Sequence, residues 1–258
     1  MDYPKDSGLL MLKISIITVV FNRVDVISDA LESVQSQTYG NVEHVIIDGG
    51  STDGTIQKIK DCQNKNHIFL SESDGGIYDA LNKGFSISSG DVIGILHSDD
   101  FFSAPQTLEK IAGLFSEETY DVVYGDLNYV SKNNLNKIIR RWRAGMFSYP
   151  RLAWGWMPPH PTLFVRRSAF ERLQGFNLQY SISADYDFLI RLFSIPGISA
   201  AYIPSVICNM RLGGESNGSL KKIWIKSFED YLIIRRNNIG GLLTLFSKNL
   251  RKIPQFLF

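Results

Sequence analysis

The chain is poor in cysteine and has no long apolar run, and each absence excludes a class of protein. Only two cysteines occur among 258 residues, Cys62 and Cys208, and they belong to no CxxC motif or cysteine–histidine cluster. A disulfide scaffold is therefore excluded, and we expect two free thiols in a reducing compartment. A membrane-spanning helix needs about 18 apolar residues. The nearest candidate, Leu9 to Val20, is interrupted by Lys13 and lacks the cleavage site of a signal peptide.

The chain also lacks an excess of charge of either sign. Its 27 Lys and Arg residues oppose 26 Asp and Glu residues, a formal net charge of +1. This balance argues against a nucleic-acid partner. The even total conceals a division, because residues 1–218 hold 19 basic and 24 acidic side chains, whereas residues 219–258 hold eight basic and two acidic ones. The sequence thus predicts an acidic body with a basic C-terminal segment.

Several well-known catalytic and nucleotide-binding motifs are missing. The chain contains no GxGxxG and no GxxxxGK[ST], which argues against a dinucleotide-binding dehydrogenase and a P-loop NTPase. It also has no GxSxG and no HExxH. A nucleotide site in this chain would therefore use carboxylates and a metal ion rather than a glycine-rich phosphate loop.

The hydrophobic pattern of the first half predicts an α/β fold. Short β-branched runs, typical of buried strands, alternate with segments of helical spacing. We predict a single Rossmann-like domain with a mostly parallel central sheet. The predicted strands are 14–20, 42–47, 67–70, 91–96 and 121–124, and the predicted helices are 22–39, 55–62, 77–87 and 105–115.

The pattern changes after residue 125, which divides the predicted domain at 13–218 into two halves, 13–125 and 126–218. Residues 1–12 are unpatterned, and 219–258 read as a helical, basic and aromatic extension. Ser168 is expected to cap a helix, since serine favours that position. The elements predicted in the second half are a hairpin at 127–142, a strand at 162–165 and helices at 168–173 and 184–193.

Polar clusters follow three of the predicted strands. In an open α/β sheet, ligands bind outside the carboxyl ends of the strands, so these clusters indicate a site. Adjacent carboxylates after an apolar strand are costly without compensation, and a hard divalent ion provides it; the alternative is an aspartate pair that caps the next helix. The clusters are Phe21-Asn22-Arg23, Asp48-Gly49-Gly50 and His97-Ser98-Asp99-Asp100.

Five ordered blocks resemble the family 2 glycosyltransferases over roughly residues 13 to 215. They are IITVVFN (16–22), VIIDGGSTDGT (45–55), GGIYDALNKG (75–84), ILHSDD (95–100) and SADYDFLIR (183–191). The third block looks most like the bacterial surface-polysaccharide and O-antigen branch, including colanic-acid-type transferases. The resemblance implies the GT-A fold and transfer that inverts the anomeric configuration.

The resemblance implies which residues bind the nucleotide sugar. Phe21 and Asn22 match an aromatic–Asn pair that borders the base, Asp48 matches the carboxylate that accepts a hydrogen bond from the base, and Asp53 either shapes that loop or caps the helix that starts at Gly54. Arg211 belongs to a segment, 210–216, that resembles a flexible closing loop, and either contacts the donor phosphate or is a surface charge. Lys83 either lies near the diphosphate or is a solvated side chain. The full implied set is Val19, Phe21, Asn22, Asp48, Gly76, Lys83, Ser98, Asp99 and Arg211.

The resemblance also implies a divalent metal, Mn²⁺ or Mg²⁺. Asp99 corresponds to the last carboxylate of the family's DxD motif, and Asp100 follows it as a second ligand. His97 stands where the family has the first Asp. It either ligates the ion, donates to phosphate or only packs.

Asp185 matches the family's catalytic base, which takes the proton of the attacking acceptor hydroxyl. Ala184 stands where the family often has Glu, and Asp187 points roughly to the opposite side of the helix. The alternative for Asp185 is a charge that only interacts with the helix dipole.

The acceptor side and the tail leave alternatives open. Trp154, Trp156 and His160 either contact the acceptor or pack in the protein. The basic, aromatic segment 219–258 either lies on an anionic membrane surface or packs on the domain.

Together these features predict a cytoplasmic enzyme, peripheral at the inner face of the membrane. We expect it to transfer a sugar from a UDP- or GDP-linked donor to a lipid-linked polysaccharide, lipopolysaccharide or O-antigen acceptor. The alternatives are a sugar nucleotidyltransferase, whose early glycine-rich phosphate loop is absent, and a non-catalytic sugar-nucleotide-binding or assembly protein.

Overall fold

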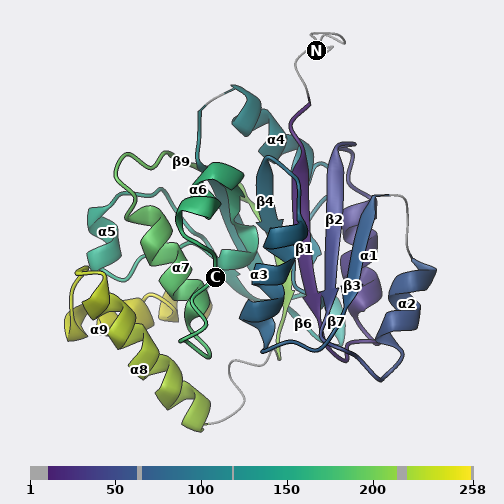
Figure 1. Ribbon diagram of the computed structural model, residues 1–258. Helices are drawn as coiled ribbons and strands as arrows, with labels where there is room; N and C mark the ends of the chain where they lie inside the picture. The colour runs from purple at the N-terminus through teal and green to yellow at the C-terminus, as the bar shows by residue number, and fades with distance from the viewer. Residues whose placement is uncertain (1–10, 63–65, 118, 214–219, 257–258) are drawn as a thin grey trace.

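The computed structural model describes residues 11–62, 66–117, 119–213 and 220–256. These residues form a nine-stranded mixed sheet with helices on both faces (Figure 1). The strands are β1 (Ile14–Val20), β2 (Val42–Asp48), β3 (His67–Ser71), β4 (Val92–Ile95), β5 (Phe101–Phe102), β6 (Val122–Ser131), β7 (Asn134–Trp142), β8 (Phe164–Arg166) and β9 (Ala200–Arg211). The helices are α1 (Ile27–Gln35), α2 (Thr55–Asp61), α3 (Ile77–Ile87), α4 (Thr107–Glu117), α5 (Pro150–Ala153), α6 (Arg167–Arg172), α7 (Ala184–Phe193), α8 (Leu220–Arg236) and α9 (Leu242–Leu250), with 3-10 turns η1 (His160–Thr162) and η3 (Ile253–Phe256).

The sheet contains both parallel and antiparallel pairs of strands. Its order is β3-β2-β1-β4-β8-β6-β9-β5, with β7 paired to β6. Strands β3, β2, β1 and β4 are parallel, as expected from βαβ units, but β8 runs antiparallel between β4 and β6. The predicted α/β architecture is confirmed, and the sheet departs from a purely parallel one where β5, β7 and β8 pair antiparallel with their neighbours. Non-local insertion of β8 explains the difference, because no local pattern encodes which strand lies next to β4.

Alternation of side chains along β1 divides the core into two layers. Ile17 and Val19 face the layer built with α3, α6 and α7, and Ile16 and Val20 face the layer built with α1, α2 and α4. Successive side chains of a strand point to opposite faces, so a strand that is buried throughout reads as a continuous apolar run. Helices therefore cover both faces and leave the carboxyl ends of the strands as the exposed edge.

Gly84 allows α3 to lie unusually close to the sheet. A Cβ atom at this position would be 2.5 Å from Ile17 Cγ2 and 3.2 Å from Ile47 Cγ1. Real Cβ atoms do not approach side chains so closely, so any larger residue would push the helix outward. This contact fixes α3 against β1 and β2, and with it the start of α3 beside the strand ends.

The predicted bounds 14–20, 77–87 and 184–193 are those of β1, α3 and α7. The helix predicted at 22–39 is shorter, because α1 spans Ile27–Gln35 and the flanking residues form turns and loops. Ser168 is not a cap, since α6 begins one residue earlier. Strand β9 was not predicted; Pro204 interrupts its pattern, where its pairing with β6 shifts register.

The C-terminal helices pack on the body rather than forming a separate extension. Ile233 and Ile234 of α8 are fully buried in the same core layer as α7. In α9, Lys248 is buried and forms an ion pair with Asp230 at 2.6 Å, with its Nζ 3.3 Å from the ring centre of Tyr186. The boundary placed after residue 218 is therefore not a boundary in packing. Among the described helices, none is long and apolar enough to cross a membrane.

Candidate active site

The three polar clusters meet at one edge of the sheet. Strands β2, β1 and β4 are neighbours and parallel, so their carboxyl ends lie side by side (Figure 1). The Gly49 N–H donates to the carbonyl of Val20 at 2.9 Å, which ties the first cluster to the second. The predicted convergence of these clusters is confirmed.

Asp48 presents an unpaired acceptor at the end of β2. Asp48 is fully buried. Its Oδ2 accepts hydrogen bonds from the N–H groups of Gly50 and Ser51, both at 3.0 Å, and from the Ser71 hydroxyl at 2.7 Å. Its Oδ1 has no hydrogen-bond partner among the described residues. A buried carboxylate oxygen without a partner is costly, so it is suited to a ligand that brings an N–H donor.

Phe21 lies beside this acceptor and is 57% exposed. A Cβ atom on Gly49 would be 3.4 Å from the Phe21 ring, so the ring borders the Asp48 loop. Asn22 adopts a φ of 51°, and its Oδ1 accepts the Thr52 N–H at 2.9 Å. The two residues together offer a flat aromatic face next to an ordered loop, which is the geometry that a planar base needs.

Asp53 stabilises the loop that follows Asp48 through hydrogen bonds to backbone N–H groups. Its carboxylate accepts the N–H groups of Thr55 at 3.0 Å and Val24 at 3.1 Å. The residue at the N-cap of α2 is Gly54, not Asp53. Asp53 therefore orders both the loop after β1 and the start of α2.

The start of α3 carries two further predicted residues. Gly76 has a φ of +111°, a conformation that favours glycine, and its N–H donates to Asp74 at 2.8 Å. Lys83 forms ion pairs with Glu72 at 2.9 Å and Asp79 at 3.4 Å. Contact of Lys83 with a diphosphate stays a prediction.

The acidic cluster after β4 separates into one accessible and one inaccessible carboxylate. Asp99 is half-buried, whereas Ser98 is buried and Asp100 is fully buried. Asp100 accepts the Arg211 N–H at 3.3 Å, and burial together with the neighbouring Asp99 charge raises the pKa of Asp100 well above its usual range. Asp100 Oδ2 has no hydrogen-bond partner among the described residues, and a role of Asp100 as a second metal ligand stays a prediction.

The donor set still fits a divalent ion held through Asp99. Within the described part of the chain, no three His, Cys, Asp or Glu side chains are grouped as a complete metal site. A hard ion such as Mg²⁺ needs only one or two carboxylates when substrate phosphates and water supply the other ligands. Asp99 would hold such an ion at the edge where the three clusters meet.

Three other predicted contacts are not supported by the positions of the residues. Arg211 is not a surface charge, since it is buried and paired with Asp29 of α1, and its contact with a donor phosphate stays a prediction. Trp156 is 3% exposed and donates its indole N–H to the Ala144 carbonyl at 2.8 Å, so it packs in the core rather than against an acceptor. The Val19 side chain is also in the core. Residues 214–216 of the predicted closing segment lie outside the described residues.

Asp185 lies in the first turn of α7, and its side chain is 26% exposed. Its Oδ2 is 3.3 Å from His160 Nδ1, and His160 Nε2 is 3.0 Å from His97 Nε2. The structure thus joins a residue from the end of β4, one from η1 and one from α7 in a single chain of polar contacts. His160 was expected at the acceptor, and its contact with Asp185 was not foreseen.

The protons of this chain can be assigned from its chemistry. A carboxylate only accepts, so His160 must donate from Nδ1, which leaves Nε2 of a neutral imidazole as the acceptor of the His97 Nε2–H. Both rings are neutral because burial lowers the pKa of His160, and burial with the neighbouring His160 lowers the pKa of His97 to about 3. In this arrangement the His160 Nδ1–H donates to Asp185 and orients its side chain.

The segment that precedes Asp185 is held from two sides. The Tyr78 hydroxyl of α3 donates to the Ile182 carbonyl at 2.5 Å and lies 3.5 Å from Asp185 Oδ1. Glu229 of α8 accepts the N–H groups of Ser181 at 2.8 Å, Ile182 at 3.0 Å and Ser183 at 2.8 Å. Neither Tyr78 nor Glu229 was singled out from the sequence as a partner of Asp185, although Tyr78 lies inside the third block.

Asp187 has a different environment. It is 3% exposed, and its Oδ2 accepts from Arg191 Nε at 2.7 Å on the same helix. A buried carboxylate in an ion pair is a poor proton acceptor for a bound substrate. The geometry therefore leaves Asp185 as the carboxylate of α7 that faces the site.

A family model and a curated relative match this chain. The model for glycosyl transferase family 2 matches residues 15–174. A Mycobacterium bovis protein named PGL/p-HBAD biosynthesis glycosyltransferase is 34% identical over 221 residues, which are 82% of this chain and 82% of that protein.

Solved structures of GT-A enzymes share the fold. Staphylococcus aureus TarS in complex with UDP-GlcNAc superimposes with a TM-score of 0.67 at 18% identity, over 95% of this chain and 72% of that one. The mannosyltransferase PcManGT from Pyrobaculum calidifontis, in complex with GDP-Man and Mn²⁺, superimposes with a TM-score of 0.68 at 16% identity, over 94% of this chain and 70% of that one.

Proposed function

Because the chain belongs to glycosyl transferase family 2, we propose that this glycosyltransferase moves a sugar from a nucleoside diphosphate donor to a glycan hydroxyl with inversion. The observation that carries the proposal is the meeting of Asp48, Asp99 and Asp185 with their partners around the carboxyl ends of β1, β2 and β4. We assign donor binding to Asp48, metal binding to Asp99 and proton transfer to Asp185.

We assign donor binding to the residues at the carboxyl ends of β1 and β2. The unpaired Oδ1 of Asp48 would accept an N–H of the base, and the exposed Phe21 ring would border its face. A ring N–H next to a carbonyl is present in both uracil and guanine, so UDP- and GDP-linked donors both fit this acceptor. The nucleotides seen with the two similar structures are of these kinds.

Asp99 would hold a Mn²⁺ or Mg²⁺ ion against the diphosphate. When bound, such an ion stabilises the negative charge that develops on the leaving nucleoside diphosphate. His97 is two residues away, but its Nε2 is already engaged by His160. This contact gives His97 a role in positioning His160, and only its Nδ1 is left for an ion or a phosphate.

The transfer itself needs one base. The acceptor oxygen forms a bond to the anomeric carbon as the bond from that carbon to the diphosphate breaks, and the hydroxyl proton passes to Asp185. His160 keeps the Asp185 carboxylate oriented through the contact at 3.3 Å. A single displacement uses one carboxylate, unlike the pair of a glycosidase.

We infer that the acceptor is a lipid-linked glycan of a surface polysaccharide or O-antigen and that the enzyme works in the cytoplasm at a membrane surface. Support for a membrane contact comes from the basic, aromatic segment 219–258. Trp154 is 65% exposed and remains a candidate acceptor contact. Family membership leaves the nucleotidyltransferase alternative without support.

A thermal-shift panel tests the donor assignment. We expect stabilisation by UDP- or GDP-sugars in the presence of Mn²⁺. Stabilisation that is equal for sugar nucleotides and unrelated nucleotides such as ATP would contradict the assignment.

Asp99→Ala is expected to weaken Mn²⁺-dependent donor binding at least ~10-fold, because a hard ion loses its protein carboxylate. Calorimetric titration with UDP- or GDP-sugar, with and without Mn²⁺, measures the effect. The control is Asp61→Asn on the exposed side of α2, which should bind like the wild type. Equal Mn²⁺ dependence in Asp99→Ala and the wild type would refute the metal assignment.

His160→Ala is expected to lower kcat about 10- to 100-fold by releasing the Asp185 carboxylate from its orientation. His160→Asn should recover part of the rate, since the asparagine amide can place a donor near the position of Nδ1. Steady-state kinetics with saturating donor separates the two variants. A normal kcat in His160→Ala, with a raised KM for the acceptor alone, would return His160 to the acceptor-binding role first predicted for it.

A further inference from the structure

Helices α8 and α9 lie along one edge of the molecule (Figure 1). Both helices expose large apolar side chains. In α9, Leu242 is 69% exposed, Leu243 84% and Phe246 63%, and in α8 Trp224 is 74% exposed. Single exposed apolar residues are ordinary, but a contiguous group of large ones marks an interaction site. These helices belong to the packed body, so their exposed face is a fixed surface.

The exposed apolar residues of α9 occupy one side of the helix. Positions 242, 243, 246 and 250 fall within an arc of about 100° at 3.6 residues per turn. The opposite side contains Thr244 and Lys248, which are 4% and 3% exposed. The usual polarity is thus reversed, since the lysine points inward and the leucines point to solvent. Packing on the domain does not explain the apolar stripe.

The exposed charged side chains described in α8, α9 and the turn after α9 are all positive. Glu229 and Asp230 are the acidic residues of segment 219–258, and both are buried, one by the N–H groups of 181–183 and the other by Lys248. Lys221, Arg235 and Arg251 are exposed. The outward face of α8 and α9 therefore combines apolar side chains with positive charge alone among its described ionisable residues.

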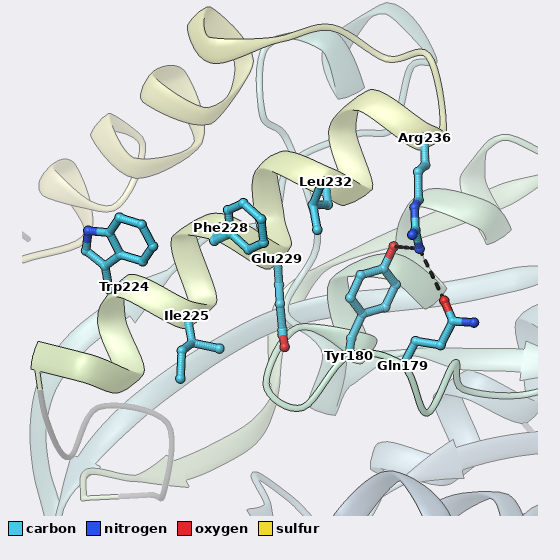
Figure 2. A pocket seen from close by; sticks show the side chains of 8 residues that line it. All are labelled: Gln179, Tyr180, Trp224, Ile225, Phe228, Glu229, Leu232 and Arg236. Carbon is cyan, nitrogen blue, oxygen red and sulfur yellow. Dashed lines mark hydrogen bonds between the residues drawn. The ribbon is translucent and has the colours of Figure 1, made fainter.

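A shallow groove extends this face toward the active site. It has a volume of about 430 Å³ and lies between α8 and the loop that precedes α7 (Figure 2). Figure 2 shows Trp224 and Phe228 along the helix, and their rings stack with centroids 6.3 Å apart. Arg236 closes one end by donating to the Tyr180 hydroxyl at 3.1 Å. The groove offers an apolar floor with a cationic end.

We propose that the exposed face of α8 and α9 is a docking surface for a lipid bilayer with anionic headgroups. Leucine and aromatic side chains enter the boundary between headgroups and acyl chains, and each exposed Lys or Arg is attracted by the negative surface potential. Charge complementarity favours a bilayer over a second copy of this chain, since two such basic faces would repel each other.

Docking at this face brings the base close to the membrane. Glu229 of α8 contacts residues 181–183, which directly precede Asp185. A bilayer on the outer side of α8 would lie one helix away from the reacting groups, where a lipid-linked acceptor presents its sugar. The functional meaning of the surface rests on the proposed function, but its affinity for lipid does not.

Flotation with vesicles tests the proposal on the full chain. We expect binding to vesicles that contain phosphatidylglycerol, weak binding to pure phosphatidylcholine vesicles, and loss of binding at high salt. The double variant Leu243→Glu/Phe246→Glu should lower partitioning about 10-fold or more, because each buried CH₂ contributes and added negative charge is repelled. Its fold should be intact, since both side chains are exposed.

Met11→Glu is the matched control, because Met11 is 55% exposed and precedes β1, whose start lies away from α8 and α9 (Figure 1). It should bind vesicles like the wild type. Equal binding of the double variant and the wild type, or no preference for anionic lipid, would overturn the proposal. A dimer in solution that the double variant dissociates would also overturn it, in favour of a protein interface. Donor stabilisation measured on the same samples reports separately on the proposed function.

Discussion

Asp185→Asn is expected to lower kcat by about 10²- to 10⁴-fold, because the amide cannot take the proton of the acceptor hydroxyl. The side chain keeps its size, and its oxygen can still accept from His160 at the site of the contact measured at 3.3 Å. Binding of the donor should therefore be unchanged. Rapid-quench or steady-state transfer assays measure kcat, and calorimetry measures donor affinity on the same protein.

A matched variant separates chemistry from a general loss of charge. Asp61→Asn removes an exposed carboxylate on α2, away from the strand ends, and should transfer sugar at the normal rate. Normal turnover in Asp185→Asn would eliminate Asp185 as the base. Loss of donor binding in that variant would instead show that Asp185 belongs to the donor site.

Glu229→Ala is expected to reduce both stability and kcat. The variant removes the acceptor of three backbone N–H groups and of the Ser181 hydroxyl at 2.8 Å. Leaving the buried Ser183 N–H unpaired costs about 1–3 kcal/mol, and the part-buried donors of Ser181 and Ile182 cost less, so we expect a fall of about 2 kcal/mol in the free energy of unfolding. Since residues 181–183 lead directly into Asp185, kcat should also fall about 10-fold or more well below the melting temperature.

The split between kcat and KM distinguishes positioning from a merely structural role. Glu229→Gln keeps one oxygen acceptor and should recover part of both losses, and Glu117→Ala, an exposed change at the end of α4, should alter neither. Urea unfolding and transfer kinetics are to be measured on the same samples. A kcat that falls only in proportion to the folded fraction would contradict the positioning role. Deleting residues 219–258 is a poor alternative test, because it also removes the buried Ile233 and Ile234.

The sequence predicted the bounds of several helices and strands well, but it did not predict which strands pair with one another. Strand β1 and helices α3 and α7 have the predicted bounds, because hydrophobic period depends on local backbone geometry. The same geometry separates Asp185 from Asp187, which lie about 200° apart on a helix, and only the first is accessible. Strand β9 and the antiparallel pairing of β8 with β4 were not predicted, because the partners of a strand come from distant parts of the chain.

The contacts of the site residues were decided by tertiary structure. His97 and His160 are 63 residues apart, and nothing local to either one indicates that they share a hydrogen bond. Tertiary packing likewise buried Trp156 in the core and paired Arg211 with Asp29, since exposure depends on which elements cover a side chain.

The basic segment 219–258 shows the same difference between what composition determines and what packing decides. The sequence by itself determined that residues 219–258 are basic and aromatic, because composition requires no folding. Only the packing of α8 and α9 decided that Lys248 and both acidic residues turn inward while Leu243 and Phe246 turn outward. The physical reason is that a helix fixes which residues share a face, but the elements packed against it decide which face is buried.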